Sequence, residues 1–275
     1  MKLSIITINL NNAEGLRKTM LSVIGQTDKD FEFIVIDGAS TDNSLKVIKD
    51  CVGVGDQGMK VRWVSEPDTG IYNAMNKGIR MSSGNYLLFL NSGDWLADAN
   101  VVETLHAADF KADIVVAKCN VVKDGKVVWS YYPQENYTFG TIYFYGIAHQ
   151  SAFIRKDLFE KYGLYDESFR YTGDTEFWYR TIVDHKATTQ ALDMLVSNYC
   201  HGGLSDMLKD DPVFKEEHRR ILSNPSYEKF LGDYEQWKDD KAWIARYKAM
   251  EHYPFIVRVL SFVERKKNSI FKRNR

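Results

Sequence analysis

Polar side chains that could bind a ligand stand at the ends of four apolar runs in the first hundred residues of this 275-residue chain. They are Thr7, Asn9 and Asn11 at the first run, Asp37, Ser40 and Asp42 at the second, Glu66 and Asp68 at the third, and Asn91, Ser92, Gly93 and Asp94 at the fourth. Carboxylates and amides with few cations suit ribose hydroxyls, a base edge or a divalent metal, and they suit a bare phosphate poorly. Each residue alone is also typical of a turn, and for Asp42 we favour a helix cap over a ligand contact.

The apolar runs are predicted to be strands that alternate with helices. Strands are expected at 3–8, 31–36, 61–64 and 86–90, and helices at 15–24, around 45–48 and around 71–79. This alternation predicts an α/β fold with a mainly parallel sheet and helices on both faces. Ligands of such sheets bind beyond the carboxyl ends of the strands, so we expect the four polar groups to share one edge.

The later sequence has a different pattern. Residues 113–120 and 126–132 flank a turn signal and predict a hairpin, and 174–183 predict a helix. The composition shifts near 206–212 to a helical, charged pattern. We therefore expect a domain at 1–205 and a C-terminal helical, basic extension at 206–275.

Several common sites have no signature here. The chain lacks GxGxxG after its first strand, GxxxxGK[ST] and GxSxG, which disfavours dinucleotide, Walker-type and serine-hydrolase sites. Its three cysteines are far apart and form no CxxC pair, which disfavours a disulfide framework or structural zinc. The first apolar run is too short for a signal peptide or a membrane span, so we expect a cytoplasmic protein.

Four motifs together resemble a family 2 glycosyltransferase of GT-A fold, a Rossmann-like architecture, in the bacterial branch that builds capsule, exopolysaccharide and O-antigen chains. They are TINLN at 7–11, VIDGASTD at 35–42, EPDTGIYNAMNKG at 66–78 and LNSGD at 90–94, and the resemblance extends over about residues 1–205. It implies a nucleoside-diphosphate sugar as donor, usually a UDP-sugar, and inversion at the anomeric carbon. The expected acceptor is a hydroxyl of a glycan or a lipid-linked glycan.

The resemblance also implies roles for individual donor-side residues. Asp37 would bind the base or ribose with help from Thr7 and Asn9, and Asp68 would border the nucleotide. Lys77 is expected either at the diphosphate or as a solvated helix lysine. The remaining members of the predicted nucleotide-sugar edge are Asn11, Ser40, Asp42, Asn91, Ser92 and Gly93.

The expected metal site departs from the family pattern. Asn91 and Gly93 stand where carboxylates are frequent, so only Asp94 keeps a charge. Mg²⁺ or Mn²⁺ is often held by one or two carboxylates together with substrate phosphates, and we expect Asp94 to be a ligand. His201, in a CHGGLS segment resembling one that follows this domain, is a second candidate, although a structural role is the alternative.

A second group of residues is expected at the acceptor. The segment GDTEFWYR at 173–180 looks like the family's acidic acceptor-site motif, and inversion needs a base that takes the proton of the acceptor hydroxyl. We assign that role to Asp174, with helix capping as the alternative, and place Glu176 on another helix face. His149 and Gln150 are expected beside the acceptor or the diphosphate, with a structural hydrogen bond as the alternative for His149.

The C-terminal end is basic while the rest of the chain is acidic. Residues 254–275 carry a net charge of +6, which leaves −7 on the remainder. This segment is expected to be an amphipathic helix. It either packs on the domain or lies on the anionic inner face of the cytoplasmic membrane. The acidic body disfavours nucleic acid as a partner.

Two rival functions stay open on the sequence. A nucleotide-sugar-binding protein without transferase activity is compatible with the missing carboxylates at 91 and 93. A nucleotidyltransferase would need a phosphate-binding loop rich in glycine and arginine after the first strand, and residues 11–15 do not provide one.

Overall fold

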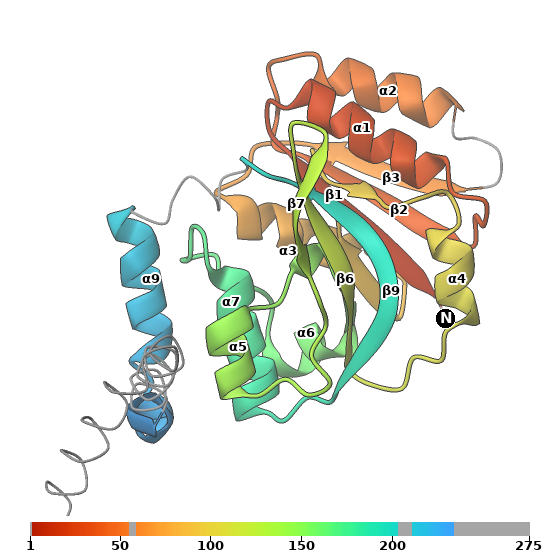
Figure 1. Ribbon diagram of the computed structural model, residues 1–275. Helices are drawn as coiled ribbons and strands as arrows, with labels where there is room; N and C mark the ends of the chain where they lie inside the picture. The colour runs from red at the N-terminus through yellow and green to blue at the C-terminus, as the bar shows by residue number, and fades with distance from the viewer. Residues whose placement is uncertain (1, 55–58, 203–210, 234–275) are drawn as a thin grey trace, which may run out of the picture. The chain divides into compact units, whose positions relative to one another are not determined.

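The computed structural model describes residues 2–54, 59–202 and 211–233, within two compact units, Met1–Ile221 and Leu222–Arg275. The first unit begins with the strands and helices that the alternating pattern predicts (Figure 1). These are β1 (Leu3–Asn9), α1 (Ala13–Ile24), β2 (Phe31–Asp37), α2 (Ser44–Val54), β3 (Lys60–Ser65), α3 (Ile71–Met81) and β4 (Tyr86–Phe89).

The later elements are shorter and more varied. They are β5 (Trp95–Leu96), α4 (Val101–Ala107), β6 (Ile114–Lys123), β7 (Lys126–Tyr131), α5 (Phe139–Tyr145), η1 (His149–Ser151), β8 (Ala152–Arg155), α6 (Asp157–Tyr162), α7 (Gly173–Trp178), η2 (Tyr179–Asp184), β9 (Thr189–Cys200) and α9 (Pro212–Leu222). The predicted hairpin is confirmed as β6 and β7. The helix expected at 174–183 is α-helical only to Trp178 and continues as a π-helix to Asp184.

One mixed sheet organises the first unit. Within the described residues it has nine strands in the order β3-β2-β1-β4-β8-β6-β9-β5, with β7 paired to β6. The strands β3, β2, β1 and β4 are parallel, so their carboxyl ends meet at one edge as expected. Antiparallel pairing begins where β8 joins β4 and β6. The predicted α/β fold with a parallel half-sheet is confirmed.

Helices cover both faces of the parallel half. Figure 1 shows α1 and α2 side by side over β1–β3, and Leu3, Ile5 and Phe33 pack with residues of these two helices in one buried cluster. On the other face, α3 lies against β1 so closely that a Cβ on Gly78 would stand 2.4 Å from the Ile6 side chain. The lack of a side chain at Gly78 therefore allows α3 to pack this closely against β1.

An aromatic cluster fixes α7 below the sheet. The rings of Phe159 and Phe177 stack with centroids 4.5 Å apart, and Tyr165 lies 5.1 Å from Phe177 and 5.6 Å from Phe89. Burial of large aromatic side chains gives strong packing with defined orientations. The cluster thereby holds α7 near the end of β4 through Phe177, Tyr165 and Phe89.

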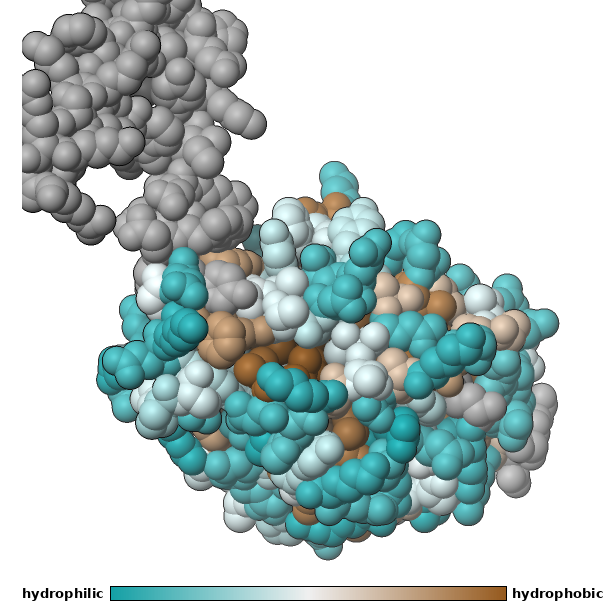
Figure 2. Space-filling model, turned by 90° about the horizontal axis from the view of Figure 1, so that it is seen from below, coloured by the Kyte–Doolittle hydropathy of each residue, from teal (hydrophilic) through white to brown (hydrophobic). Residues whose placement is uncertain are grey.

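The second unit is described over a short stretch. It contains η3 (Pro225–Tyr227), where Asn224 caps the turn by accepting the N–H of Ser226. The basic segment 254–275, predicted to be an amphipathic helix, lies outside the described residues. No helix in the described part of the chain is long and apolar enough to cross a membrane. Figure 2 shows a mainly hydrophilic face whose most hydrophobic atoms lie in a hollow near its middle.

Candidate active site

The loop after β4 is held by the first helix. Thr19, on α1, donates its hydroxyl to the Asp94 carbonyl at 2.6 Å and accepts the Gly93 N–H at 3.0 Å. Gly93 has φ +108°, a conformation that favours glycine and lets the loop turn back on itself. The turn directs the Asp94 carboxylate toward the end of β9, where it accepts the Cys200 N–H at 3.0 Å.

Asp94 is a buried carboxylate, with 5% of its surface exposed. Burial raises the pKa of Asp94 to about 6, although the Cys200 N–H, the nearby His149 and Lys18, and a hydrogen bond from the Gln150 side chain all favour the charged form. Gln150 therefore lies at the predicted metal ligand, whereas the sequence suggested the acceptor or the diphosphate. A buried group poised near neutral pH is typical of functional sites.

His149 joins the donor-side loop to the candidate base. Its Nε2 lies 3.2 Å from the Asn91 Nδ2, and its Nδ1 lies 3.2 Å from the Asp174 Oδ2. Both contacts are satisfied by one neutral tautomer, with Nδ1–H donating to Asp174 and Nε2 accepting from Asn91. Three residues that the sequence assigned to two separate groups thus form one hydrogen-bonded chain.

The Asp174 carboxylate is oriented from both sides. Its Oδ1 accepts the Thr175 N–H at 2.8 Å and the Tyr72 hydroxyl at 3.2 Å. Burial alone would raise the pKa of Asp174, but the hydrogen bond from His149, with the bonds from Thr175 and Tyr72, holds it below its usual value. The carboxylate is therefore ionised and can accept a proton. The Thr172 side chain makes no capping bond, and Asp174 lies inside α7, so simple capping does not explain its position.

The approach to Asp174 is fixed by a buried glutamate on α9. Glu217 accepts the N–H groups of Arg170, Tyr171 and Thr172, and also the Thr172 hydroxyl at 3.0 Å. Next in the chain, Gly173 lies against Tyr72, whose ring would stand 2.8 Å from any Cβ at that position. These contacts set where α7 begins.

The second strand, β2, ends in Asp37, whose two carboxylate oxygens both accept hydrogen bonds. Asp37 is fully buried and accepts hydrogen bonds from Asn9 at 2.8 Å, Ser65 at 2.6 Å and both the hydroxyl and the N–H of Ser40. Burial acts to raise the pKa of Asp37, but these bonds outweigh it and lower the pKa. The Asn9 Oδ1 is buried without a partner and is a free acceptor beside this cluster. Nucleotide binding by Asp37 and Asn9 stays a prediction.

Other residues of the predicted nucleotide-sugar edge form hydrogen bonds that hold the loops at the ends of the strands. Thr7 has no exposed surface and donates to the Leu90 carbonyl at 2.6 Å, which argues against direct contact with a ligand. Asn11 accepts the Thr41 N–H at 2.8 Å and donates its own N–H to Ser40. Asp42 accepts the N–H groups of Ala13 and Ser44, both at 2.9 Å, as expected for a cap.

Asp68 and Lys77 form an ion pair at the third strand. Their charged atoms lie 2.6 Å apart, and Lys77 also contacts Glu66 at 3.0 Å. Burial acts to lower the pKa of Lys77, but these carboxylates outweigh it and raise the pKa. Lys77 is therefore neither a solvated lysine nor a free cation for the diphosphate in this geometry. Gly38 leaves room for Asp68, since a Cβ there would stand 2.9 Å from the Asp68 Oδ2.

Glu176 and His201 are placed apart from the hydrogen-bonded chain. Glu176 pairs with Arg180 at 2.7 and 2.8 Å, and that arginine donates to backbone carbonyls of 162–164. Glu176 thus stabilises α7 on a different face from Asp174. His201 follows β9, donates its N–H to the Val122 carbonyl at 2.8 Å and is exposed. In the described residues, no three histidine, cysteine or acidic side chains converge as a metal site.

Three residues that shape the site were missed by the sequence reasoning. Thr19 lies on an amphipathic helix and gave no signal. Tyr72 stands within the motif at 66–78, so the motif could have indicated it. Glu217 is a buried acid in a charged helix, and only its contacts with 170–172 reveal its part.

Comparison with known proteins identifies the family of this chain. The model of "Glycosyl transferase family 2" matches residues 4–173. The chain belongs to glycosyltransferase family 2. A "PGL/p-HBAD biosynthesis glycosyltransferase" of Mycobacterium bovis is 28% identical over 216 residues, covering 77% of this chain and 82% of the relative. An uncharacterized glycosyltransferase of Mycobacterium tuberculosis is 33% identical over 186 residues, covering 63% and 66%.

Solved structures share the fold of this family 2 glycosyltransferase. Staphylococcus aureus TarS has a TM-score of 0.62 at 20% identity, with 81% of this chain covered and only 39% of TarS. TarS 1–349 in complex with UDP-GlcNAc has a TM-score of 0.56 at 19% identity, covering 73% of this chain and 58% of TarS 1–349. A Pyrobaculum calidifontis mannosyltransferase with GDP-Man and Mn²⁺ has a TM-score of 0.53 at 16% identity, covering 70% and 55%.

Proposed function

We propose that this protein transfers a sugar from a nucleoside-diphosphate sugar, a UDP-sugar, to a hydroxyl of a glycan or lipid-linked glycan, with inversion. The observation that carries the proposal is the contact between His149 and the partly buried Asp174, beside the loop at 91–94. This contact supports a role for Asp174 as a base that His149 orients beside the predicted nucleotide-sugar edge. The UDP-GlcNAc complex of TarS, which has the same fold, supports the choice of donor.

Asp174 acts as the general base. Its Oδ1 is occupied by Tyr72 and Thr175, so the proton of the acceptor hydroxyl is taken on Oδ2, which has a second lone pair besides the one directed at His149. The rigid orientation of the carboxylate lowers the entropic cost of reaching the reactive geometry. Burial raises the pKa of the Tyr72 hydroxyl well above its usual value, so Tyr72 remains a donor throughout.

The donor set beside Asp94 fits a divalent cation that is bound together with the donor. The Asn91 Oδ1 is buried without a partner, and Asp94 provides one buried carboxylate. Two such oxygens suit hard Mg²⁺ or Mn²⁺, which take their remaining ligands from water and phosphate. When bound, the ion would neutralise charge on the departing diphosphate. Asp94 and Asn91 would hold it, and His201 remains a further candidate.

The biological role follows the family resemblance. We propose that the enzyme acts in bacterial surface polysaccharide synthesis, at the inner face of the cytoplasmic membrane. The mycobacterial relative, named as a PGL/p-HBAD biosynthesis glycosyltransferase, supports a biosynthetic role. The division into a catalytic domain at 1–205 and a basic extension at 206–275 is part of this proposal. Membrane contact would involve 254–275, outside the described residues.

The arrangement around Asp174 disfavours a protein that binds a nucleotide sugar without catalysis. Withdrawing a carboxylate from water is costly unless it is hydrogen-bonded, and the partly buried Asp174 accepts from three donors, His149, Thr175 and Tyr72. A protein that only binds the donor would not need this arrangement beside the loop at 91–94.

Turnover of nucleotide sugars tests the proposal. The full chain with Mn²⁺ or Mg²⁺ is incubated with a panel of UDP-, GDP- and dTDP-sugars, and released nucleotide and the anomeric configuration of the product are followed by NMR. We expect hydrolysis or transfer of at least one UDP-sugar with inversion. Donor binding without turnover would instead support the binding protein, and retention of configuration would refute the mechanism.

A further inference from the structure

A cavity of about 640 Å³ lies between the β6–β7 hairpin, the end of β9 and the segment after α5. Seven of its 17 lining residues are aromatic, and none of the 17 is Asp, Glu, Lys or Arg. Its volume falls within the roughly 300–1,000 Å³ of small-molecule sites, which combine an apolar lining with a few polar groups. Such a lining favours a neutral ligand with flat apolar faces.

Strand register gathers part of this lining on one face of the sheet. Val121 of β6 is opposite Trp129 of β7 and Tyr199 of β9, and Tyr131 is two residues from Trp129. Residues directly opposite each other, and residues two apart, point to the same side of a sheet. The rings of Trp129, Tyr131 and Tyr199 therefore flank Val121 on the cavity side.

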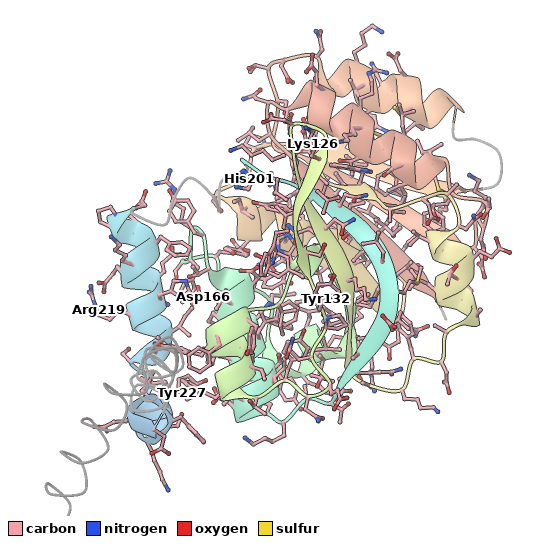
Figure 3. The ribbon with its side chains drawn as sticks, viewed as in Figure 1. Lys126, Tyr132, Asp166, His201, Arg219 and Tyr227 are labelled. Atoms are coloured by element: carbon pink, nitrogen blue, oxygen red, sulfur yellow. The ribbon has the colours of Figure 1, made fainter. Side chains whose placement is uncertain are left out.

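Four of the seven lining aromatic side chains, Trp129, Tyr131, Tyr132 and Tyr145, are open to solvent. Trp129 and Tyr132 are each 64% exposed, and Tyr145 is 54% exposed. Clustered exposed rings around a hollow point to an interaction site more strongly than scattered ones do. Figure 3 places Tyr132 at the base of the hairpin and Lys126 at its tip.

The cavity is bordered by two segments that also carry residues of the candidate active site. Ala148 and Ser151 line it and flank His149 and Gln150, which contact Asp174 and Asp94 respectively. His201 also lines it and directly follows Cys200, whose N–H binds the Asp94 carboxylate. A molecule in this cavity therefore lies against the segments whose neighbouring residues contact Asp94 and Asp174.

We propose that this cavity binds the acceptor through a neutral pyranose ring that stacks on Trp129 and Tyr199. A pyranose presents an apolar C–H face to an aromatic ring and hydroxyls at its rim, where the hydroxyls of the exposed Tyr132 and Tyr145 offer hydrogen-bonding atoms. The lining contains no lysine or arginine, and the nearby Lys118, whose ammonium lies 5.7 Å from the centroid of the Tyr132 ring, is paired with Asp193. The lining therefore does not favour a phosphate or a carboxylate. The acceptor class is thus a glycoside with an uncharged terminal sugar, and this inference rests on the proposed function.

Saturation-transfer NMR on the full chain with UDP tests the proposal. The probes are methyl glycopyranosides of glucose, galactose, mannose and N-acetylglucosamine, with methyl glucuronide, phenol and hexyl phosphate as comparison arms. We expect at least one neutral glycoside to bind. Trp129→Ala should weaken it roughly three- to tenfold, and Trp129→Phe should weaken it less, because part of the stacking surface is kept.

Val127→Ala is the matched control. Val127 is on the same strand and 57% exposed but does not line the cavity, so its substitution should leave glycoside binding unchanged. Binding of phenol, hexyl phosphate or methyl glucuronide in preference to every neutral glycoside would overturn the proposal, as would equal binding by Trp129→Ala. If wild-type protein turns over a donor but binds no glycoside, this inference alone fails. If it turns over no donor, the proposed function fails.

Discussion

Asn91 decides which nitrogen of His149 carries the proton. Its amide donates to the His149 Nε2, which leaves Nδ1–H to donate to Asp174. An aspartate at 91 could not donate, and His149 would have to be doubly protonated to serve both carboxylates. The departure from the acidic family pattern therefore has a structural reason besides metal binding.

Asn91→Asp is expected to lower donor turnover by about tenfold. A second carboxylate would hold His149 as a cation, and that charge would lower the pKa of Asp174 further and weaken it as a base. Steady-state kcat at several Mn²⁺ concentrations measures the effect, with the exposed Asn100→Asp as control. If position 91 merely lacked a metal ligand, Asn91→Asp would instead raise turnover at low Mn²⁺.

Asp94→Asn is expected to stabilise the metal-free protein while it lowers activity. Burial raises the pKa of Asp94 to about 6 in the folded state, above its unfolded value. The stabilising effect of the protonated form is complete below about pH 4 and is lost as the pH rises through 6. At pH 8 the ionised carboxylate then destabilises the fold by on the order of 3 kcal/mol, which asparagine avoids.

Urea unfolding at pH 4.5 and pH 8 measures this difference. The variant should gain about 1–3 kcal/mol over the wild type at pH 8 and clearly less at pH 4.5. An equal loss of stability at both pH values would mean that Asp94 is a structural residue whose bond to Cys200 outweighs its burial.

At the scale of elements, α9 positions the start of α7. Glu217 accepts four hydrogen bonds from residues 170–172, and glutamine could not accept all of them, because its amide group would face backbone N–H donors. Glu217→Gln should therefore lower kcat at least tenfold with a smaller change in the KM for the donor, since Asp174 is displaced and the nucleotide edge is not.

The adjacent Glu216→Gln is the matched control, because Glu216 is exposed and pairs only with Arg219 among the contacts described. Kinetics are read together with thermal unfolding. A Glu217→Gln protein that loses stability but keeps its kcat at low temperature would show that α9 supports the fold without positioning α7.

The strands and helices with strong hydrophobic periodicity were predictable from the sequence. The pairing of the later strands, which brings distant residues together, was not. Strands β1, β2 and β4 are fully buried apolar runs, so their assignments need no tertiary information. By contrast, β8 is a four-residue strand, and β9 pairs with β6 through register shifts. The hydrogen-bonded chain depends on those pairings, because His149 lies 58 residues from Asn91 and 25 from Asp174.

At the scale of the whole molecule, metal and donor are expected to bind cooperatively. Asp94 is the one carboxylate of the loop at 91–94, and a single carboxylate is expected to bind a divalent ion weakly. Donor phosphates would complete the site, and linkage requires each ligand to raise the affinity for the other by the same factor.

Titration calorimetry with Mn²⁺ in the presence and absence of UDP measures this coupling. We expect Mn²⁺ to bind at least about tenfold more tightly when UDP is bound, a coupling of about 1.4 kcal/mol. The Asp94→Ala protein should show little coupling. Tight Mn²⁺ binding without UDP would point to a complete protein site elsewhere in the chain.

The central claim is that Asp174, held by His149, removes the acceptor proton. The most direct test compares Asp174→Asn with wild type in donor turnover and in UDP affinity on the same preparations, with the exposed Asp109→Asn as control. We predict a loss of turnover of at least about 10²-fold, within the usual range for a general base, and a change in UDP affinity below about twofold. Turnover by Asp174→Asn at the wild-type rate would contradict the claim.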